Sequence, residues 1–269
     1  MQLLHARSLL FLPASNARAI EKARSLPCDM VILDLEDAVA EENKQAARDA
    51  LASAFATGFG ERLKAVRVNG VGARHHVKDM QAARDTAADV VVLPKVERVT
   101  DIEAVLGSTG KPIIAMIESP LGLSHAQEIA AAHGVAGLFM GNNDLRHDLR
   151  IPMDADRSGL MLAMQSVILA ARLSGKAVFD GVYNRLDDAE GFRAECREGR
   201  ALGFDGKTLI HPNQIADANA IFGPSEQELA DARALIAAAT GGAERHDGKM
   251  IEAMHVAQAR ALLARAGER

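Results

Sequence analysis

Short apolar runs alternate with stretches of helical periodicity along most of the chain. The runs are rich in Val, Ile, Leu, Phe and Met, and each precedes a segment in which apolar residues recur every three or four positions. They lie within residues 8–13, 29–38, 63–70, 89–95, 112–119, 135–144, 176–183 and 204–212. Strands this uniformly apolar are typical of parallel sheets that helices cover on both faces. The pattern therefore predicts an α/β fold, a (β/α)8 TIM barrel, with an open doubly wound sheet as the alternative.

A shorter segment follows the eighth unit, and we divide the chain into a barrel at 1–223 and a helical extension at 224–269. The extension is expected to contain a helix at 225–240, a polar hinge at 241–248 and a second helix at 249–266. Ser225 and Glu228 have the spacing of a helix-capping box. A segment of this size is too small to fold alone. It is expected to pack on its own barrel or on that of a neighbouring subunit, which suggests an oligomer.

Composition and charge argue against several kinds of partner. The chain has 269 residues, a net charge of −5, no Trp and one Tyr, which disfavours nucleic-acid binding by basic surfaces or stacked aromatic side chains. Cys28 and Cys196 are far apart and are expected to be reduced core residues. The sequence has no signal segment and no apolar run of about 18 residues, so we expect a cytoplasmic protein with no membrane partner.

A barrel places its chemistry where the strands end, at the carboxyl-terminal rim. Glu118 directly follows the apolar residues 113–117, and Asp144 follows the next apolar run. Two carboxylates at the ends of neighbouring strands repel each other unless a proton or a cation lies between them. Oxygen ligands favour Mg²⁺ or Mn²⁺, and Mg²⁺ typically takes one or two protein carboxylates together with water and substrate. The alternative is that Glu118 forms a structural salt bridge with Arg67 or Lys95.

Arg67 is a second charged residue at the expected rim, and it has apolar neighbours on both sides. A guanidinium at the mouth of the barrel can hold a substrate carboxylate through two parallel hydrogen bonds. The alternative is an internal ion pair with Asp34, Glu36 or Asp37, the three acids of the segment DLEDAV. The residues alone leave both interpretations open.

Eight motifs, taken in order, carry a resemblance to a known family. They are RSLLFLP, ILDLEDAVAEENKQAAR, VRVNG, VVLPKVE, IIAMIESPLGL, DGVY, LGFDGKTLIHPNQI and DGKMIEA. From about residue 7 to residue 265 the chain resembles the HpcH/HpaI aldolase and citrate lyase beta-subunit family. The nearest pattern within that family is the stand-alone citrate-lyase-like proteins, which include malyl-CoA and citramalyl-CoA lyases. The resemblance implies a Mg²⁺-dependent (β/α)8 barrel that cleaves or forms a carbon–carbon bond.

The resemblance also implies roles for individual residues at the rim. Glu118 and Asp144 would be the metal ligands, and Arg67 would hold the carboxylate and the oxygen of a 2-oxo acid. Arg67 and Glu118 are therefore expected to act in catalysis as well as in substrate binding. Asp37 is also expected to bind the substrate.

The resemblance places the CoA thioester and a neighbouring subunit beside this rim. Arg7, Arg18 and Lys22 lie near the first strand and helix, where related proteins bind the CoA phosphates, although Arg18 and Lys22 also suit an ordinary solvated helix face. A related motif, GKMID, reaches into the neighbouring subunit's site and supplies a catalytic Asp. Here Glu252 occupies that position, and its extra methylene can move a proton donor by more than about 1 Å, a misplacement that typically lowers the rate about 100-fold.

The sequence thus predicts a lyase that cleaves a 3-hydroxy-dicarboxylyl-CoA, such as malyl-CoA or citramalyl-CoA, into acetyl-CoA and a 2-oxo acid. One alternative is a CoA-independent class II aldolase that acts on hydroxy-oxo acids. Another is a non-catalytic oligomer that binds a metal ion and an acyl-CoA. By family analogy the oligomer is a trimer. The choice between CoA and an acyl-carrier protein, and between lyase, synthase and thioesterase, stays open at this point.

Overall fold

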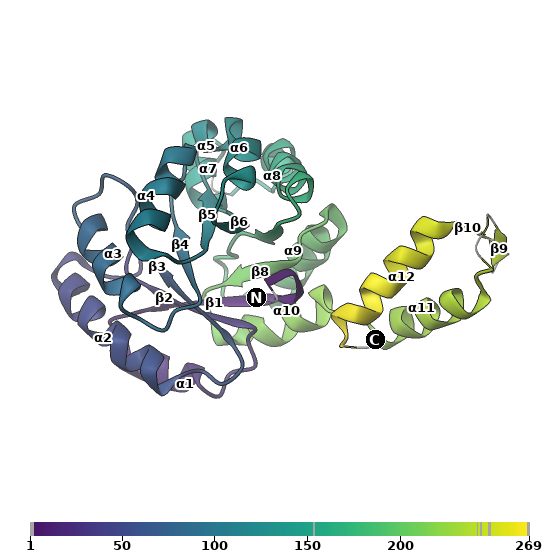
Figure 1. Cartoon of the computed structure of the whole chain (residues 1–269), viewed down its shortest axis with the longest axis horizontal. Coiled ribbons are helices and arrows are strands. Elements are labelled where there is room, and N and C mark those ends of the chain that lie inside the picture. The colour runs from purple at the N-terminus through teal and green to yellow at the C-terminus, as the bar shows by residue number, and fades with distance from the viewer. Residues whose placement is uncertain (1–2, 153, 241, 243, 247–248, 268–269) are drawn as a thin grey trace.

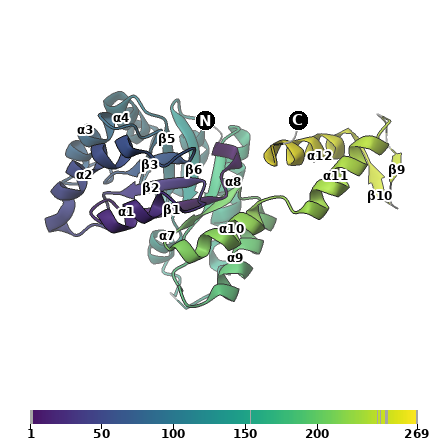
Figure 2. The same ribbon diagram turned by 90° about the horizontal axis from the view of Figure 1, so that it is seen from below.

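The computed structural model of the protein describes residues 3–152, 154–240, 242, 244–246 and 249–267. Among these residues, eight parallel strands close into a barrel in chain order, because β8 is hydrogen-bonded back to β1. The strands are β1 (Ser8–Pro13), β2 (Met30–Asp34), β3 (Leu63–Arg67), β4 (Val90–Leu93), β5 (Ile113–Ile117), β6 (Val135–Met140), β7 (Ala177–Asp180) and β8 (Gly206–Leu209). Helices surround the barrel (Figure 1, Figure 2), which confirms the predicted (β/α)8 fold.

The helices connect consecutive strands around the outside of the barrel. They are α1 (Ala17–Ala23), α2 (Lys44–Thr57), α3 (His76–Arg84), α4 (Val99–Thr109), α5 (Pro120–Ser124), α6 (Ala126–Ala131), α7 (Asn142–Asp148), α8 (Met161–Leu173), α9 (Ala189–Leu202) and α10 (Ile215–Phe222), with 3₁₀ turns η1 (Leu3–His5), η2 (Glu41–Asn43), η3 (Ser158–Leu160) and η4 (Pro212–Gln214). Side-chain caps start two of the helices at the rim. Asn16 Oδ1 accepts the Ala19 N–H at 3.0 Å, and Ser119 Oγ accepts the Gly122 N–H at 3.0 Å.

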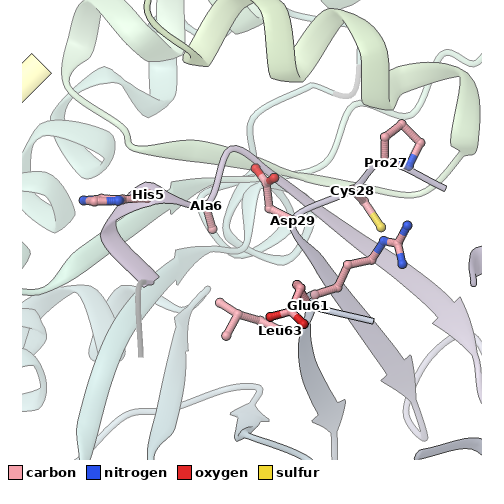
Figure 3. A pocket seen from close by; sticks show the side chains of 8 residues that line it. His5, Ala6, Pro27, Cys28, Asp29, Glu61 and Leu63 are labelled. Carbon is pink, nitrogen blue, oxygen red and sulfur yellow. The ribbon is translucent and has the colours of Figure 1, made fainter. Parts of the chain in front are cut away.

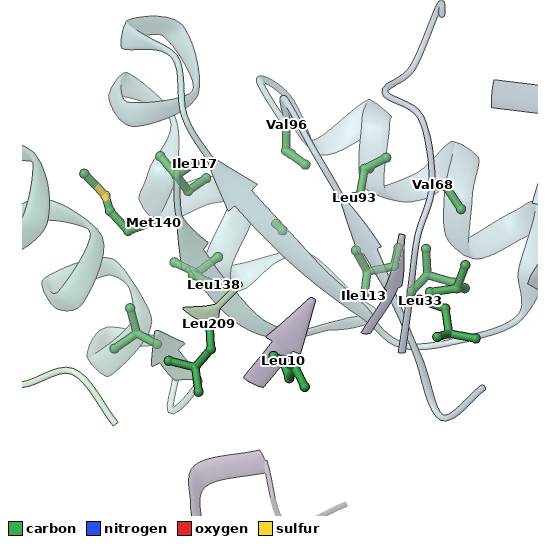
Figure 4. Packing of buried hydrophobic residues seen from close by; sticks show 14 of the residues in the cluster. Leu10, Leu33, Val68, Leu93, Val96, Ile113, Ile117, Leu138, Met140 and Leu209 are labelled. Atoms are coloured by element: carbon green, nitrogen blue, oxygen red, sulfur yellow. The ribbon is translucent and has the colours of Figure 1, made fainter. Parts of the chain in front are cut away.

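Side chains along each strand alternate between two apolar layers. The outer layer packs against the helices and includes Leu10, Leu33, Leu93, Ile113 and Leu138 (Figure 4). The inner layer fills the barrel with Leu9, Phe11, Met30, Ile32, Ala65, Val90, Val92, Ile114, Met116, Phe139, Ala177 and Phe179. Three of its rings pack edge to face, with centroid distances of 6.2 Å and 5.5 Å. The barrel interior is thus a packed core that ends just below the carboxyl-terminal rim.

The same alternation decides which polar residues at the strand ends face the barrel axis. Asp34, Arg67 and Glu118 each lie two residues beyond an inner-layer side chain. Asp180, at the end of β7, has the opposite parity and is fully buried on the helix side of the sheet, against Gly199 of α9. A polar residue at a strand end is therefore not automatically part of the rim site.

The extension after Gly223 projects from one side of the barrel (Figure 1, Figure 2). Its elements are α11 (Glu226–Ala238), the antiparallel strands β9 (Glu244–His246) and β10 (Lys249–Ile251), and α12 (Ala253–Arg265), which packs along α11. The predicted capping box is confirmed, since Ser225 Oγ accepts the Glu228 N–H at 3.2 Å and Glu228 Oε2 accepts the Ser225 N–H at 2.8 Å. Arg265 Nη2 donates to the carbonyl of Asp205 at 3.1 Å and ties the end of α12 to the barrel.

The extension departs from the sequence prediction where its second helix begins. The sequence predicts helix from residue 249, but residues 249–251 pair as a strand with residues 244–246. Glu252 then adopts an extended backbone conformation, and its N–H donates to His255 Nδ1 at 2.9 Å. This cap starts α12 at Ala253, four residues later than predicted.

Both cysteines are free and buried, which confirms their prediction as reduced core residues. Burial raises the pKa of the Cys28 thiol to about 11 and that of the Cys196 thiol to about 12. Both thiols are therefore neutral at physiological pH and unreactive as nucleophiles. In the described part of the chain, none of the helices combines the length and the apolar character that crossing a bilayer requires.

Candidate active site and metal centre

Arg67 and Asp34 occupy paired positions of β3 and β2 at the rim. Asp34 Oδ1 accepts a hydrogen bond from Arg67 Nε at 2.7 Å, and Asp34 Oδ2 accepts one from Nη2 at 2.5 Å. Burial opposes the guanidinium charge, but the nearby carboxylates of Asp34 and Glu36 outweigh it and raise the pKa of Arg67. The guanidinium also packs over the ring of Phe11 at 4.8 Å. Arg67 is thus a permanent cation in a fixed orientation.

Glu36 and Lys95 continue this ion-pair network across the rim. Glu36 Oε2 lies 3.0 Å from Arg67 Nη1. Lys95 Nζ lies 3.6 Å from Glu36 Oε1 and 3.6 Å from Asp144 Oδ2. Glu36 is buried, whereas about half of the Lys95 side chain is exposed. These contacts join the last residue of β3 to the segments that follow β2, β4 and β6.

Glu118 is buried directly beyond β5. Its Oε1 accepts the backbone N–H of Lys95 at 2.7 Å, while Oε2 has no hydrogen-bond donor among the described residues. Oε2 lies against Gly141, where a Cβ would come within 2.4 Å of it, so only glycine leaves the carboxylate its room. Among the described residues, the side chain of Glu118 forms no salt bridge with Arg67 or Lys95. Their salt bridges are with other carboxylates, so the structural ion pair that was the alternative to metal binding is not formed.

Asp144 lies in the first turn of α7, four residues beyond the end of β6 at Met140. Together with Arg67 and Glu118 it lines a cavity of about 330 Å³ at the rim. Asp37 lines the same cavity. A cavity of this size, at this end of a barrel, suits a small organic acid with a hydrated metal ion.

Two carboxyl groups at this rim hold their protons far more strongly than usual. Burial raises the pKa of Glu118 to about 7, and the charges of Glu36 and Asp144 add to the effect. Burial also raises the pKa of Glu36 to about 7, with Asp37 and other carboxylates adding and Arg67 opposing. The raised pKa values of Glu118 and Glu36 result from burial together with the negative charge of neighbouring carboxylates. A cation bound there would relieve it.

The residues of this rim fit a hard divalent cation. Glu118 Oε2 is without a donor and is accommodated by Gly141, and Asp144 is near enough to raise the pKa of Glu118. Both supply oxygen, which Mg²⁺ prefers. The described residues contain no group of three or more His, Cys, Asp or Glu side chains arranged around a metal position. Two carboxylates completed by water and substrate are the usual ligation of Mg²⁺ in enzymes.

Arg7 lies at the opposite end of the barrel from this cavity. It precedes β1, whose 6 residues span about 20 Å before the rim is reached. Its guanidinium is paired with Asp29, with Nε–Oδ2 and Nη2–Oδ1 distances of 3.0 Å. Asp29 lines a separate open cavity of about 700 Å³ at this amino-terminal end (Figure 3). Within one chain, Arg7 thus joins the starts of β1 and β2, away from the rim cavity, and its predicted contact with the CoA phosphates stays a prediction.

Arg18 and Lys22 lie on the exposed face of α1, which begins four residues beyond β1, with Arg18 in its first turn and Lys22 in its last. Their side chains form no ion pair with another described residue. Two unpaired cations of this kind are available to a phosphate group of a ligand that approaches the rim. Asp37 is exposed at the cavity wall.

Glu252 is exposed at the start of α12, beside the hairpin at the end of the extension that lies away from the barrel (Figure 1, Figure 2). A single chain therefore does not bring Glu252 to its own Glu118. Gly248 of the same motif lies outside the described residues. A catalytic role for Glu252 requires a neighbouring chain.

Asp34, Glu36 and Lys95 organise the site, whereas from the sequence Asp34 and Glu36 were expected as ion-pair partners and Lys95 as a charge balance or a further anchor. The period of two along β2 is a signal that could have placed Asp34 inside the barrel. Asn142 was missed altogether: it is buried, it lines the cavity, and its Oδ1 has no hydrogen-bond partner. No sequence pattern distinguishes it from the neighbouring Asn143.

The sequence model of the HpcH/HpaI aldolase/citrate lyase family matches residues 7–212. The chain belongs to this family. The match confirms the resemblance predicted from the eight motifs, and it contains the rim from Arg67 to Asp144. The extension lies beyond the matched residues.

Individual relatives are similar over nearly the whole chain. A (3S)-malyl-CoA thioesterase of Cereibacter sphaeroides is 44% identical over 97% of this chain and 94% of its own length. The citrate lyase subunit beta of Escherichia coli is 35% identical over 97% of this chain and 93% of its own. The crystal structure of CitE from Mycobacterium tuberculosis in complex with magnesium, acetoacetate and coenzyme A superimposes with a TM-score of 0.82, at 34% identity and 98% coverage of both chains.

Proposed function

We propose that this family member is a Mg²⁺-dependent lyase that cleaves a 3-hydroxy-dicarboxylyl-CoA, such as malyl-CoA or citramalyl-CoA, into acetyl-CoA and a 2-oxo acid. The observation that carries the proposal is the convergence of Arg67, Glu118 and Asp144 on one cavity at the barrel rim. The magnesium, acetoacetate and coenzyme A bound by the M. tuberculosis CitE support the same choice of metal and ligand classes. Mn²⁺ is expected to substitute for Mg²⁺.

Each rim residue has a distinct part in this proposal. Glu118 and Asp144 would hold the metal, which when bound polarises the oxygen on the carbon that becomes the oxo group. Asp34 takes two of the five N–H donors of the Arg67 guanidinium, so donors remain for the carboxylate of the acid. Glu36, with a pKa of about 7, is a group of this rim that exchanges a proton readily at neutral pH.

The reaction balances as a retro-Claisen cleavage. The substrate hydroxyl loses its proton, and the bond between the hydroxyl carbon and the neighbouring methylene breaks. The electron pair of that bond passes to the thioester enolate, and one proton then adds to the enolate carbon to give acetyl-CoA. The fixed cation of Arg67 favours this step because it holds the departing oxo acid in place while charge moves.

Hydrolysis of the same thioester is a second candidate, because the 44% identical relative is a (3S)-malyl-CoA thioesterase. In that reaction water attacks the thioester carbonyl, the C–S bond breaks and CoA leaves as the thiol. The substrate class and the binding residues are the same in both cases. The two reactions differ only in which bond of the bound thioester breaks.

One assay separates these candidates. Purified full-length protein is incubated with (3S)-malyl-CoA and Mg²⁺, and glyoxylate and free thiol are measured in parallel, with chelator and with Glu118→Gln as controls. Glyoxylate without thiol supports the lyase, and thiol without glyoxylate supports the thioesterase. If malyl-CoA yields neither glyoxylate nor thiol and citramalyl-CoA yields neither pyruvate nor thiol, while a CoA-free hydroxy-oxo acid is cleaved, the protein is instead a class II aldolase.

Further parts of the proposal concern CoA, assembly and location. Arg18 and Lys22 are proposed to bind the CoA phosphates, since both are exposed on α1 and form no ion pair with another described residue. We also propose that the chain forms a homo-oligomer, a trimer by family analogy, in which the extension at 224–269 brings Glu252 to the cavity of a neighbour. A cytoplasmic location stays a prediction from the sequence. Light scattering of the purified protein tests the assembly, and a monomer would contradict it.

A further inference from the structure

Lys95 has a left-handed backbone conformation, which is energetically unfavourable for a residue with a Cβ atom. Its φ is +53°, one of two positive values at non-glycine residues among the described parts of the chain. A left-handed conformation at such a residue costs roughly 1 kcal/mol or more and persists only where the surroundings enforce it. Here the next residue enforces it, because the Val96 N–H donates to the Met116 carbonyl at 3.2 Å and the Val96 carbonyl packs tightly against Gly122.

This conformation lets one residue touch three acids. The backbone N–H of Lys95 donates to Glu118 Oε1 at 2.7 Å. Its Nζ lies 3.6 Å from Asp144 Oδ2 and 3.6 Å from Glu36 Oε1. The ammonium is thus a counterion for Glu36 and for Asp144, and Asp144 is one of the two candidate metal ligands.

The ammonium contacts are long, and the side chain is half exposed. Because the lysine side chain is flexible and these ion pairs are long, the ammonium group can leave one carboxylate at a small free-energy cost and stay with the other. Glu36 is buried, and it is held on its other side by Arg67 at 3.0 Å. Glu36 is therefore the carboxylate with which Lys95 stays when Asp144 is taken by another cation.

We propose that Lys95 is a built-in counterion that competes with the divalent cation for Asp144. Without metal, its ammonium offsets the charge of Asp144 and Glu36. When the cation binds at Glu118 and Asp144, Lys95 yields Asp144 and pairs with Glu36 alone. The backbone N–H of Lys95 keeps Glu118 Oε1 in place throughout, so that Oε2 stays oriented. Lys95 thereby weakens metal binding and preserves the site in the metal-free protein. This inference rests on the metal site of the proposed function.

Calorimetric titration of Mg²⁺ into chelator-treated full-length protein tests the competition without any turnover. Lys95→Met removes the ammonium and keeps the stem and the backbone N–H. We expect the variant to bind Mg²⁺ about tenfold more tightly than the unmodified protein, because a positive charge near the dication is lost. Lys95→Arg, which keeps a charge, and Lys78→Met, which removes an exposed lysine from α3, are expected to bind within twofold of the unmodified protein.

A thermal melt supplies a second readout. Lys95→Met is expected to melt at a lower temperature than the unmodified protein in chelator, and saturating Mg²⁺ is expected to close that gap. If Lys95→Met does not fold, Lys95→Gln takes its place in both measurements. Unchanged or weaker Mg²⁺ binding by the neutral variant overturns the inference but leaves the proposed metal site intact. Absence of Mg²⁺ binding by the unmodified protein overturns both.

Discussion

The carboxylate of Asp34 and the guanidinium of Arg67 form a two-point ion pair that is almost withdrawn from water, with side-chain exposures of 0% and 13%. The pair is a consequence of register, since Asp34 and Arg67 are direct partners on neighbouring strands that share the inward parity. It gives the rim a cation whose direction is fixed before any substrate arrives.

Replacing Asp34 by Asn tests this fixed orientation. Asp34→Asn keeps the size of the side chain but removes the charge that accepts from Arg67 Nε and Nη2. We expect kcat/KM for the acyl-CoA to fall about 10- to 100-fold, mostly through KM, as Arg67 loses its alignment. Asp89→Asn, which alters an acid at the other end of the barrel beside Lys64, is the matched control. Equal kinetics for both variants would contradict a positioning role.

The two proposed ligands are expected to differ in their effect when neutralised. Glu118→Gln removes a buried carboxylate, so Mg²⁺ binding should weaken by at least about 100-fold, whereas Asp144→Asn at a more exposed position should weaken it by about tenfold or more. Calorimetry measures both. Asp148→Asn, an exposed acid of the same helix α7, is expected to bind as the unmodified protein does. Unaltered affinity in Glu118→Gln would remove Glu118 from the site.

The metal-free protein is expected to lose stability as pH rises through the window from about 4.5 to 7. The folded state raises the pKa of Glu36 and Glu118 from 4.5 to about 7, so within this window it binds more protons than the unfolded state. The slope of stability against pH is then negative, and the loss should be on the order of several kcal/mol, at most about 3 for each of the two groups. Urea unfolding in chelator at about pH 5 and about pH 8 measures it.

Mg²⁺ should reverse this loss at high pH, because deprotonated carboxylates bind it and protonated ones do not. The stabilisation by Mg²⁺ is therefore expected to be larger at about pH 8 than at about pH 5. The double variant Glu36→Gln/Glu118→Gln should show neither the negative slope nor the Mg²⁺ effect. Stability that increases with pH across the window in the unmodified, chelated protein would contradict the assignment.

A second buried ion network supports the fold rather than the site. Lys207 and Asp180 are both fully buried, their Nζ–Oδ2 distance is 2.7 Å, and Arg157 contacts the same carboxylate at 2.9 Å. Lys207→Met leaves Asp180 short of charge compensation and should destabilise the protein by about 3–5 kcal/mol. Mg²⁺ affinity of the folded fraction should not change. A loss below about 1 kcal/mol in urea unfolding would show that the network tolerates the deletion.

Glu252 is expected to act across a subunit interface, and mixed oligomers test this. Glu118→Gln and Glu252→Gln should each be nearly inactive alone. Co-refolded together, they should recover about a quarter of the unmodified activity, because some cavities then combine an intact Glu118 with a neighbour's intact Glu252. No recovery, in oligomers shown to contain both variants, would contradict the shared site. Glu252→Asp reports whether the longer side chain limits the rate.

The sequence predicted the barrel because eight apolar runs in alternation with helical periodicity have few other solutions. It placed Arg67 and Glu118 at the rim because a charge inside an apolar run has to lie at a strand end. It did not choose between ligand binding and ion pairing for Arg67, since the Asp34 contact depends on the register between β2 and β3. The contact of Arg7 with Asp29 was not predicted, since it depends on how the starts of β1 and β2 lie side by side.

Two further features had no local signal. The strand at 249–251 forms because residues 244–246 pair with it in antiparallel orientation, while its own sequence is compatible with a helix. The contacts of Lys95 with Glu36 and Asp144 depend on a positive φ at a residue type that rarely adopts one. Non-local pairing and enforced backbone conformation are what a single sequence does not reveal.

Crystals grown with Mn²⁺ and measured at the manganese absorption edge show whether Glu118 and Asp144 share one divalent cation. We expect one anomalous peak at the rim, about 2 Å from an oxygen of Glu118 and from an oxygen of Asp144, with Lys95 Nζ moved to Glu36. A crystal without that peak, in which Lys95 still contacts Asp144 at saturating Mn²⁺, would contradict it.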